Sequence, residues 1–298
     1  MTMQSSHTYQ HIEVRQLAPA LGAEVLGIDL NSPLEEQAKD ELLDAWQHHL
    51  VLVFPNQAIS DDAQVTFSRR FADLEVYPLS DNRNVRHPEI FRVSNCDEDG
   101  NLLPADDPES LWNNLTEYWH TDSSYRPAPA KGAVLHGIEI PEHGADTIFV
   151  NLAAAYDALP AARRSLLDKY WATHDWQFGY SYAGHLMKAM DGAEIAAVPP
   201  VRHPLIRTDP ATGRKSLYIS PGYIRGIDGM SDKDAQILIK ELSDWATQPE
   251  FVFKHHWRKH DVLMWDNRST MHAREAFDYG NHRRILHRTT LVGEALVT

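Results

Sequence analysis

The sequence predicts a mainly β protein, a jelly roll with helical additions. Three observations support this fold class. Short apolar or alternating runs follow one another from about residue 90 onward, helical segments are scattered rather than alternating with strands, and turn residues separate the runs. The chain shows no internal repeat, low-complexity tract or Gly/Ser linker. We therefore expect one domain spanning residues 1–298.

The first third mixes strands and helices. "HIEVRQLA" and "AEVLGIDL" alternate as strands do, and "LVLVF" (50–54) is typical of a buried strand. Ser32 and Pro33 predict the start of a helix through "LEEQAKDELLDAWQHH", with proline at its first position. Ser60 predicts the start of a second helix, "DDAQVTFSRRFA".

From about residue 90, strands dominate. The predicted strands are "IFRVSN", "EYWHTD", "AVLHGIEI", "DTIFV", "VRHPLIR", "SLYIS", "FVFKHHW", "DVLMW" and "RRILHRTTLV". Helices are expected near 151–170 and from Ser231 onward. Two long irregular stretches remain, 95–114 and 177–197. Long loops in compact domains are usually functional lids or disordered insertions. Of these two alternatives, we expect 177–197 to act as an active-site lid.

Composition excludes several classes of partner. A formal charge of −14 argues against nucleic acid or an anionic membrane surface. No apolar run approaches the length of a membrane span, and the first residues do not resemble a signal peptide. The lone cysteine, Cys96, is typical of a reducing compartment. We therefore expect a cytoplasmic protein. Separately from composition, we expect a small-molecule substrate and a homo-oligomeric assembly.

A metal site is indicated by "EYWHTDSSY" (117–125). His120 and Asp122 are two residues apart, so in a strand both side chains would lie on one face. A buried carboxylate is costly unless it is paired or binds a metal. His-x-Asp/Glu occurs three times in the chain, about as often as composition alone predicts. Only this copy lies in an aromatic, β-favouring stretch, and the alternative is a polar pair at a strand end.

A third ligand candidate, His272, follows the apolar run "DVLMW" (261–265). The alternative, a histidine at the surface, is the commoner case. Two histidines and one carboxylate, two close together and one distant, are typical of non-haem Fe(II) oxygenases, whereas zinc sites more often use three histidines or cysteines. Arg284 and Arg288 share one face of the last predicted strand. If that face is internal, both guanidiniums need anionic partners, such as small carboxylates.

Together these segments resemble the taurine dioxygenase / 2,4-dichlorophenoxyacetate dioxygenase family of Fe(II)- and 2-oxoglutarate-dependent oxygenases. The resemblance covers nearly the whole chain. It rests on "LVFPNQAIS", "FSRRFADLE", "WHTDSSY", "PEHGADTIFVNLAAAYDALP", "HPLIRTDPATGRKSLYIS", "WDNRSTMH" and "HRRILHRTT" in the family's order. It implies a double-stranded β-helix and a reaction that consumes 2-oxoglutarate and O2 at Fe(II), releasing succinate and CO2.

Residue by residue, the resemblance implies iron ligands at His120, Asp122 and His272. It implies that Thr147 and Arg284 bind the C5 carboxylate of 2-oxoglutarate. It also implies that Arg288 lies near the C1 carboxylate and the substrate anion. The stretch between His272 and the arginines is about one residue longer than expected, so Arg283 competes with Arg284, and strand parity with Arg288 favours Arg284.

The substrate class is the open question. The taurine branch carries Asn four residues before the first histidine, where this chain has Thr116. "WHTDSSY" and the "SYAGHL" loop are closer to the aryloxyalkanoate branch, which implies hydroxylation beside an ether oxygen and cleavage of the ether. We expect Thr116, Tyr182, His185 and Arg288 to contact the substrate. Alternatives are a sulfonate, a natural carboxylate metabolite, or a sensor on the same scaffold that performs no turnover.

Overall fold

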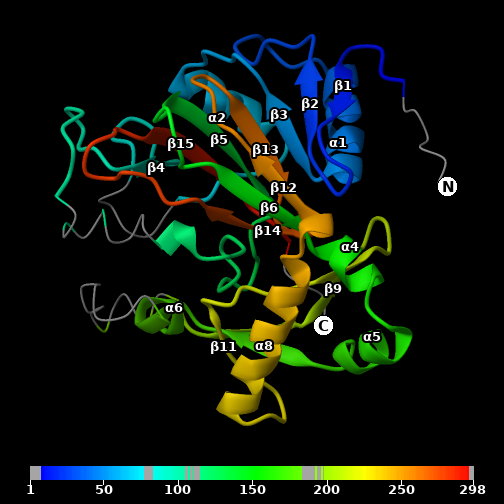
Figure 1. The fold of residues 1–298 in the computed structure, drawn as a ribbon. Helices are drawn as coiled ribbons and strands as arrows, with labels where there is room; N and C mark the ends of the chain where they lie inside the picture. The colour runs from blue at the N-terminus through cyan, green and yellow to red at the C-terminus, as the bar shows by residue number, and fades with distance from the viewer. Residues whose placement is uncertain are drawn as a thin grey trace.

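The computed structural model describes residues 8–76, 83–104, 107, 110, 115–182, 192, 196 and 198–294, with the backbone alone for 180–182. Two antiparallel-rich sheets dominate (Figure 1). The larger has the strand order β1-β2-β3-β13-β5-β15-β4, and the smaller has the order β12-β6-β14. This arrangement confirms the predicted jelly roll with helical additions.

The bounds of the strands in these two sheets follow. They are β1 (Glu13–Gln16), β2 (Ala23–Leu26), β3 (Val51–Phe54), β4 (Ile90–Ser94), β5 (Gly132–Glu139), β6 (Thr147–Asn151), β12 (Val252–His255), β13 (Val262–Asp266), β14 (Thr270–Arg274) and β15 (Ile285–Leu291). A further group of shorter strands comprises β7 (Trp171–His174), β8 (Val201–Pro204), β9 (Ile206–Thr208), β10 (Lys215–Leu217) and β11 (Ile224–Ile227).

The helices are α1 (Glu36–His49), α2 (Asp61–Arg69), α4 (Leu152–Asp157), α5 (Ala161–Leu167), α6 (Trp176–Tyr182) and α8 (Asp232–Ala246), with short 3-10 turns η1 (Leu115–Glu117) and η2 (Pro249–Phe251). Ser60 and Ser231 cap α2 and α8 through their side chains, as predicted. None of the helices in the described part of the chain is long and apolar enough to cross a membrane.

Strand β13 separates two hydrophobic cores because successive side chains point to opposite faces. Leu263 and Trp265 lie between the two sheets, where Phe149 and Phe253 project from the smaller sheet. Val262 and Met264 point the other way, into a core that α1 and α2 cover. The face between the sheets carries the candidate site at its open end, since His272 lies on β14 beside Phe149.

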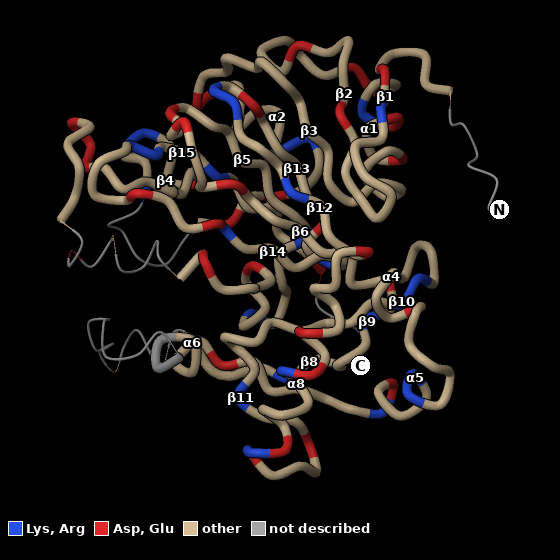
Figure 2. Tube along the Cα trace, in the orientation of Figure 1, with Lys and Arg blue, Asp and Glu red and all other residues tan. Residues whose placement is uncertain are grey.

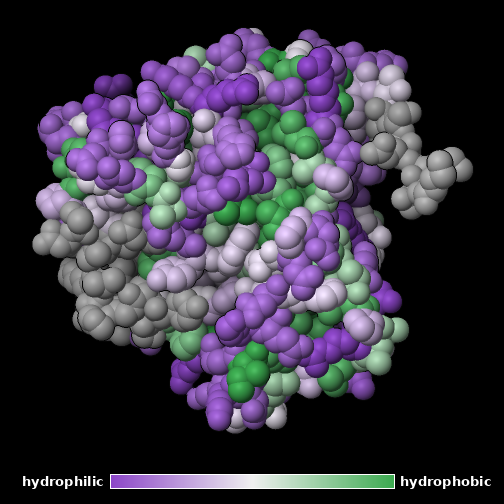
Figure 3. Space-filling model, viewed as in Figure 1, coloured by the Kyte–Doolittle hydropathy of each residue, from purple (hydrophilic) through white to green (hydrophobic). Residues whose placement is uncertain are grey.

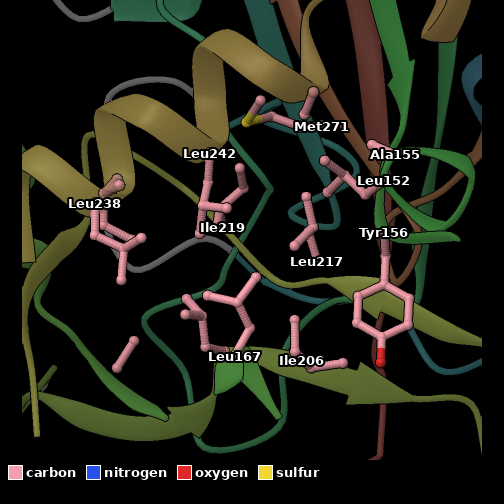
Figure 4. Close-up of a cluster of buried hydrophobic side chains, with 14 of the residues drawn as sticks. Leu152, Ala155, Tyr156, Leu167, Ile206, Leu217, Ile219, Leu238, Leu242 and Met271 are labelled. Carbon is pink, nitrogen blue, oxygen red and sulfur yellow. The ribbon is translucent and has the colours of Figure 1, made fainter. Parts of the chain in front are cut away.

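A third core lies below the sheets, where α8 covers β11 and the segments around β9 and β10 (Figure 4). Leu238 and Leu242 of α8 pack with Leu167, Leu217 and Met271. Met271 belongs to β14, so this core supports the outer face of the strand that carries His272. Strand β14, which carries His272, therefore has the core between the two sheets on one face and the core under α8 on the other.

Two local predictions were wrong. The first helix begins at Glu36, not at Pro33, because Ser32 bonds backward to Asp29 in a turn. "EYWHTD" is not a strand: its first residue, Glu117, is the last residue of η1, and His120 pairs with His272 in an isolated bridge before the chain turns. The predicted lid at 177–197 lies mostly outside the described residues, which include its first part as α6.

The surface agrees with the composition. Figure 2 shows acidic and basic residues interspersed along the outer loops. In Figure 3 hydrophilic residues cover much of the visible face, and hydrophobic residues gather around the position that β12 and β13 occupy in Figure 1.

Candidate active site

His120, Asp122 and His272 converge at the open end of the jelly roll. One potential ligand atom from each residue lies within 4.8 Å of the others. His120 Nε2 is 3.7 Å from Asp122 Oδ1, and His272 Nε2 is 4.0 Å from Asp122 Oδ2. Backbone N–H groups of the two histidines donate to each other's carbonyl oxygens at 3.0 and 2.9 Å. The bridge explains how residues 152 positions apart meet.

The protonation of the two imidazoles suits a cation. His120 Nδ1 lies 2.7 Å from the Tyr118 carbonyl oxygen, which requires the proton on Nδ1 and leaves a lone pair on Nε2. Burial lowers the pKa of His120. Burial, together with neighbouring His120, lowers the pKa of His272 to about 3. Two neutral nitrogens and one carboxylate therefore face one point, and this donor set fits Fe(II).

The turn that carries Asp122 is fixed by side-chain bonds to its backbone. Asn267 Oδ1 accepts from the Asp122 N–H at 3.0 Å, and Asn267 Nδ2 donates to the Asp122 carbonyl at 2.7 Å. Thr121 Oγ1 donates to the Ile219 carbonyl. Ser123 has a φ of 52°, an uncommon value for a residue other than glycine. These bonds replace a strand ladder, which is why a β-favouring sequence turns here.

Arg288 contacts the carboxylate directly. Its Nη1 donates to both oxygens of Asp122, at 2.9 and 3.1 Å. Burial opposes ionisation of Asp122, but Arg288 and the two histidines hold the pKa of its carboxyl below the usual value. Arg288 also lies over the Phe91 ring. A guanidinium thus reaches the metal-binding point and can bind an anion there.

A pocket opens at this point and has a largely aromatic wall. It is lined by Phe91, Val93, Leu115, Thr116, Tyr118, Trp119, His120, Asp122, Ser123, Tyr125, Gly179, Gly222, Tyr223 and Arg288. Predicted contacts Thr116 and Arg288 are among these residues. The other two predicted substrate contacts, His185 and the side chain of Tyr182, lie outside the described residues. An anion-binding end beside an apolar wall suits an amphiphilic acid.

A second, smaller pocket adjoins the first at Thr116. It is lined by Val93, Ser94, Asn95, Thr116, Arg274, Phe277, Tyr279 and Arg284. Arg284 is buried, and burial together with nearby Arg274 lowers its pKa to about 9. Arg283 instead pairs with Glu139 at the surface, at 2.9 Å. The buried guanidinium is therefore that of Arg284, as strand parity favoured.

Thr147 is the first residue of β6 and lies directly opposite Arg274 of the paired strand β14. It is buried, and its hydroxyl accepts from Trp257 Nε1 at 2.9 Å. Arg274 was not singled out from the sequence, although it follows His272 by two residues and so faces the same way. It donates to Thr116 Oγ1 and to Glu117, and it connects the two pockets.

Comparison with known proteins identifies the family to which this chain belongs. Residues 13–290 match the family model described as taurine catabolism dioxygenase TauD, TfdA family. The chain belongs to the TauD/TfdA family. This confirms the resemblance drawn from the sequence motifs.

Relatives in the TauD/TfdA family match over almost their whole length. The alpha-ketoglutarate-dependent 2,4-dichlorophenoxyacetate dioxygenase of Cupriavidus pinatubonensis is 33% identical, over 94% of this chain and 98% of that protein. The (S)-phenoxypropionate/alpha-ketoglutarate-dioxygenase of Delftia acidovorans is 32% identical, over 96% and 99%. The crystal structure of AAD-2 in complex with Mn(II) and N-oxalylglycine superposes with a TM-score of 0.88 at 34% identity, covering 97% of this chain and all of that one.

Proposed function

We propose that this protein, as one domain, is an Fe(II)- and 2-oxoglutarate-dependent dioxygenase that hydroxylates a small organic acid, an aryloxyalkanoate whose ether bond then breaks. The observation that carries the proposal is the first pocket, where a His-Asp-His cluster, an arginine and an aromatic wall meet. The names of the relatives in Cupriavidus and Delftia support the substrate class. We also propose a cytoplasmic homo-oligomer.

His120, Asp122 and His272 would hold the iron, and Arg284, assisted by Thr147, would bind the C5 carboxylate of 2-oxoglutarate. Bound iron would supply O2 activation coupled to decarboxylation of 2-oxoglutarate into succinate and CO2. Arg288 would orient the substrate carboxylate beside the metal-binding point, since its Nη1 already lies 2.9 Å from Asp122. The aromatic wall would exclude water and hold the carbon that is bonded to the ether oxygen close to the metal-binding point.

The product follows from where the hydroxyl is added. A carbon bearing both the ether oxygen and a new hydroxyl is a hemiacetal or hemiketal. It loses the aryl oxygen as a phenol while its own C–O becomes a carbonyl, with one proton passing to the phenol. The organic products are therefore a phenol and an aldehyde or keto acid.

Substrate-dependent succinate formation tests the proposal. Aryloxyalkanoates, sulfonates and natural carboxylates would be compared, with phenol release measured in parallel. We expect succinate and phenol in equal amounts with an aryloxyalkanoate, and much less turnover with its neutral amide. Equal turnover of acid and amide would remove the carboxylate from the recognition. Turnover of a sulfonate or metabolite alone would overturn the substrate class.

The ligand set has its own test. Anaerobic Fe(II) with 2-oxoglutarate should give a visible charge-transfer absorption in the wild type, and Asp122→Ala and His272→Ala should abolish it. Circular dichroism would establish that both variants remain folded. A folded variant with the wild-type spectrum would exclude that residue from the iron site.

A further inference from the structure

A glycine inside a helix forms part of the wall of the first pocket. Gly179 is the fourth residue of α6 and lines the pocket together with Tyr223. Helix α6 is anchored at its start, where Asp175 Oδ1 accepts from the Gln177 N–H at 2.9 Å. Glycine is the poorest helix former apart from proline, so its presence inside a helix asks for a specific reason.

The reason is a close approach of Tyr223. A Cβ added at Gly179 would lie 2.5 Å from Cε1 and 2.7 Å from Cδ1 of the Tyr223 ring. Atoms that are not bonded do not approach this closely, so an alanine at this position would force the ring to move. The ring edge thus rests directly on the bare backbone of the helix.

The ring has little freedom to retreat. Tyr125 lies on another side of it, with ring centroids 5.0 Å apart, and Tyr125 is itself stacked on Trp176 at 5.7 Å. The Tyr223 backbone is fixed at both its polar groups, since its N–H donates to the Ser220 carbonyl and its carbonyl accepts from the Asp175 N–H. Open space remains on the pocket side, so displacement of the ring would narrow the pocket.

We propose that Gly179 and Tyr223 form a specificity-determining pair that sets the width of the substrate group admitted beyond the carboxylate. The proposal rests on the proposed function, because it assumes that the substrate occupies this pocket. Arg288 lies over Phe91 and would fix the acid end, whereas Tyr223 lies on the wall formed by α6 and the segment before β11. The width of the pocket at this wall therefore determines which groups fit at the end of the substrate remote from its carboxylate.

Gly179→Ala tests the proposal. We expect kcat/KM for an acid with a substituted aryl ring to fall by about tenfold or more, while an acid with a slim alkyl chain loses less than about threefold. The KM for 2-oxoglutarate should not change. Gly280→Ala is the matched control, because a Cβ at this exposed position meets nothing within 4 Å. Thermal unfolding of Gly179→Ala would be measured in parallel, because the higher helix propensity of alanine and the clash with Tyr223 have opposite effects on stability.

A compensating substitution separates ring displacement from general damage. Tyr223→Leu removes the ring edge that the new Cβ would strike, so the Gly179→Ala/Tyr223→Leu double variant should recover turnover of the wide acid relative to Gly179→Ala. Proportional losses for wide and slim acids, or a double variant no better than Gly179→Ala, would overturn the proposal.

Binding measured without turnover distinguishes failure of this inference from failure of the proposed function. Trp119 lines the pocket, so the change in tryptophan fluorescence can report binding of both the acid with a substituted aryl ring and the acid with a slim alkyl chain. If the wild type binds these acids but turns none over, the aryloxyalkanoate function fails while the width comparison still decides the inference. If the wild type binds neither acid, both proposals fail.

Discussion

Arg283 and Arg284 are adjacent in sequence but differ in burial and in the residues they contact. Arg284 is buried beside Arg274 and lines the smaller pocket, whereas Arg283 forms an exposed ion pair with Glu139. Removing one partner of a buried charge pair costs roughly 2–5 kcal/mol. Arg284→Ala should therefore raise the 2-oxoglutarate concentration required for half-maximal activity by about 30-fold or more. Kinetics at varied 2-oxoglutarate would measure this.

The matched control is Arg283→Ala, which should leave that concentration within about threefold, because exposed ion pairs contribute little. If Arg283→Ala raised it and Arg284→Ala did not, the assignment of the anchor would be wrong by one residue. Strand parity predicted which of these two neighbours is buried. Arg274, two residues after His272, shares the parity of that ligand but belongs to no sequence motif that marks it as functional.

The turn 121–124 depends on a side chain from the segment that connects the two sheets between β13 and β14. Asn267 lies between β13 and β14 and bonds both backbone polar groups of Asp122. Groups that orient metal ligands typically contribute 10- to 100-fold to metal affinity. Asn267→Ala should therefore weaken Mn(II) binding by about this factor, as measured by titration followed by electron paramagnetic resonance.

Asn281→Ala serves as the control for that experiment, since Asn281 is exposed and its side chain donates to the carboxylate of Asp278. Unchanged Mn(II) affinity in a folded Asn267→Ala protein would contradict the positioning role. The sequence predicted the apolar strands around this turn well, because burial on both faces leaves a clear signal. It did not predict the turn itself, because Thr121, Ser123 and Asn267 act through long-range bonds that leave no local pattern.

For the molecule as a whole, buried histidines tie stability to pH. His136 of β5 lies on the face of the larger sheet that α2 covers, as Val134 does. Burial lowers its pKa from 6.5 to about 4, with smaller contributions from His260 and His287 in the same direction and from Asp61 in the opposite one. Between these values the unfolded chain binds a proton that the folded chain does not. The free energy of unfolding is therefore not reduced by His136 above pH 6.5. It falls as the pH drops toward 4, and this residue accounts for at most about 3 kcal/mol of the fall.

Replacing His136 should flatten this fall. Urea unfolding of His136→Gln between pH 4 and pH 7 should give a shallower dependence of the unfolding free energy on pH than the wild type. His256→Gln provides the comparison, because the His256 side chain is 78% exposed. A slope equal to that of the wild type would contradict the effect. The sequence revealed the jelly roll but not which histidines it buries, since this depends on how α2 covers the sheet.

The paired backbone bonds between His120 and His272 bear on how the protein would acquire and lose its metal. Two of the three donor residues are tied to each other by main-chain bonds, and the backbone of the third is bonded to the side chain of Asn267. Little ordering of the chain would then accompany chelation, in contrast to small metal domains that fold only when loaded. Stripping the ion should leave a folded, reloadable protein, in which the amides of His120 and His272 stay protected from hydrogen exchange.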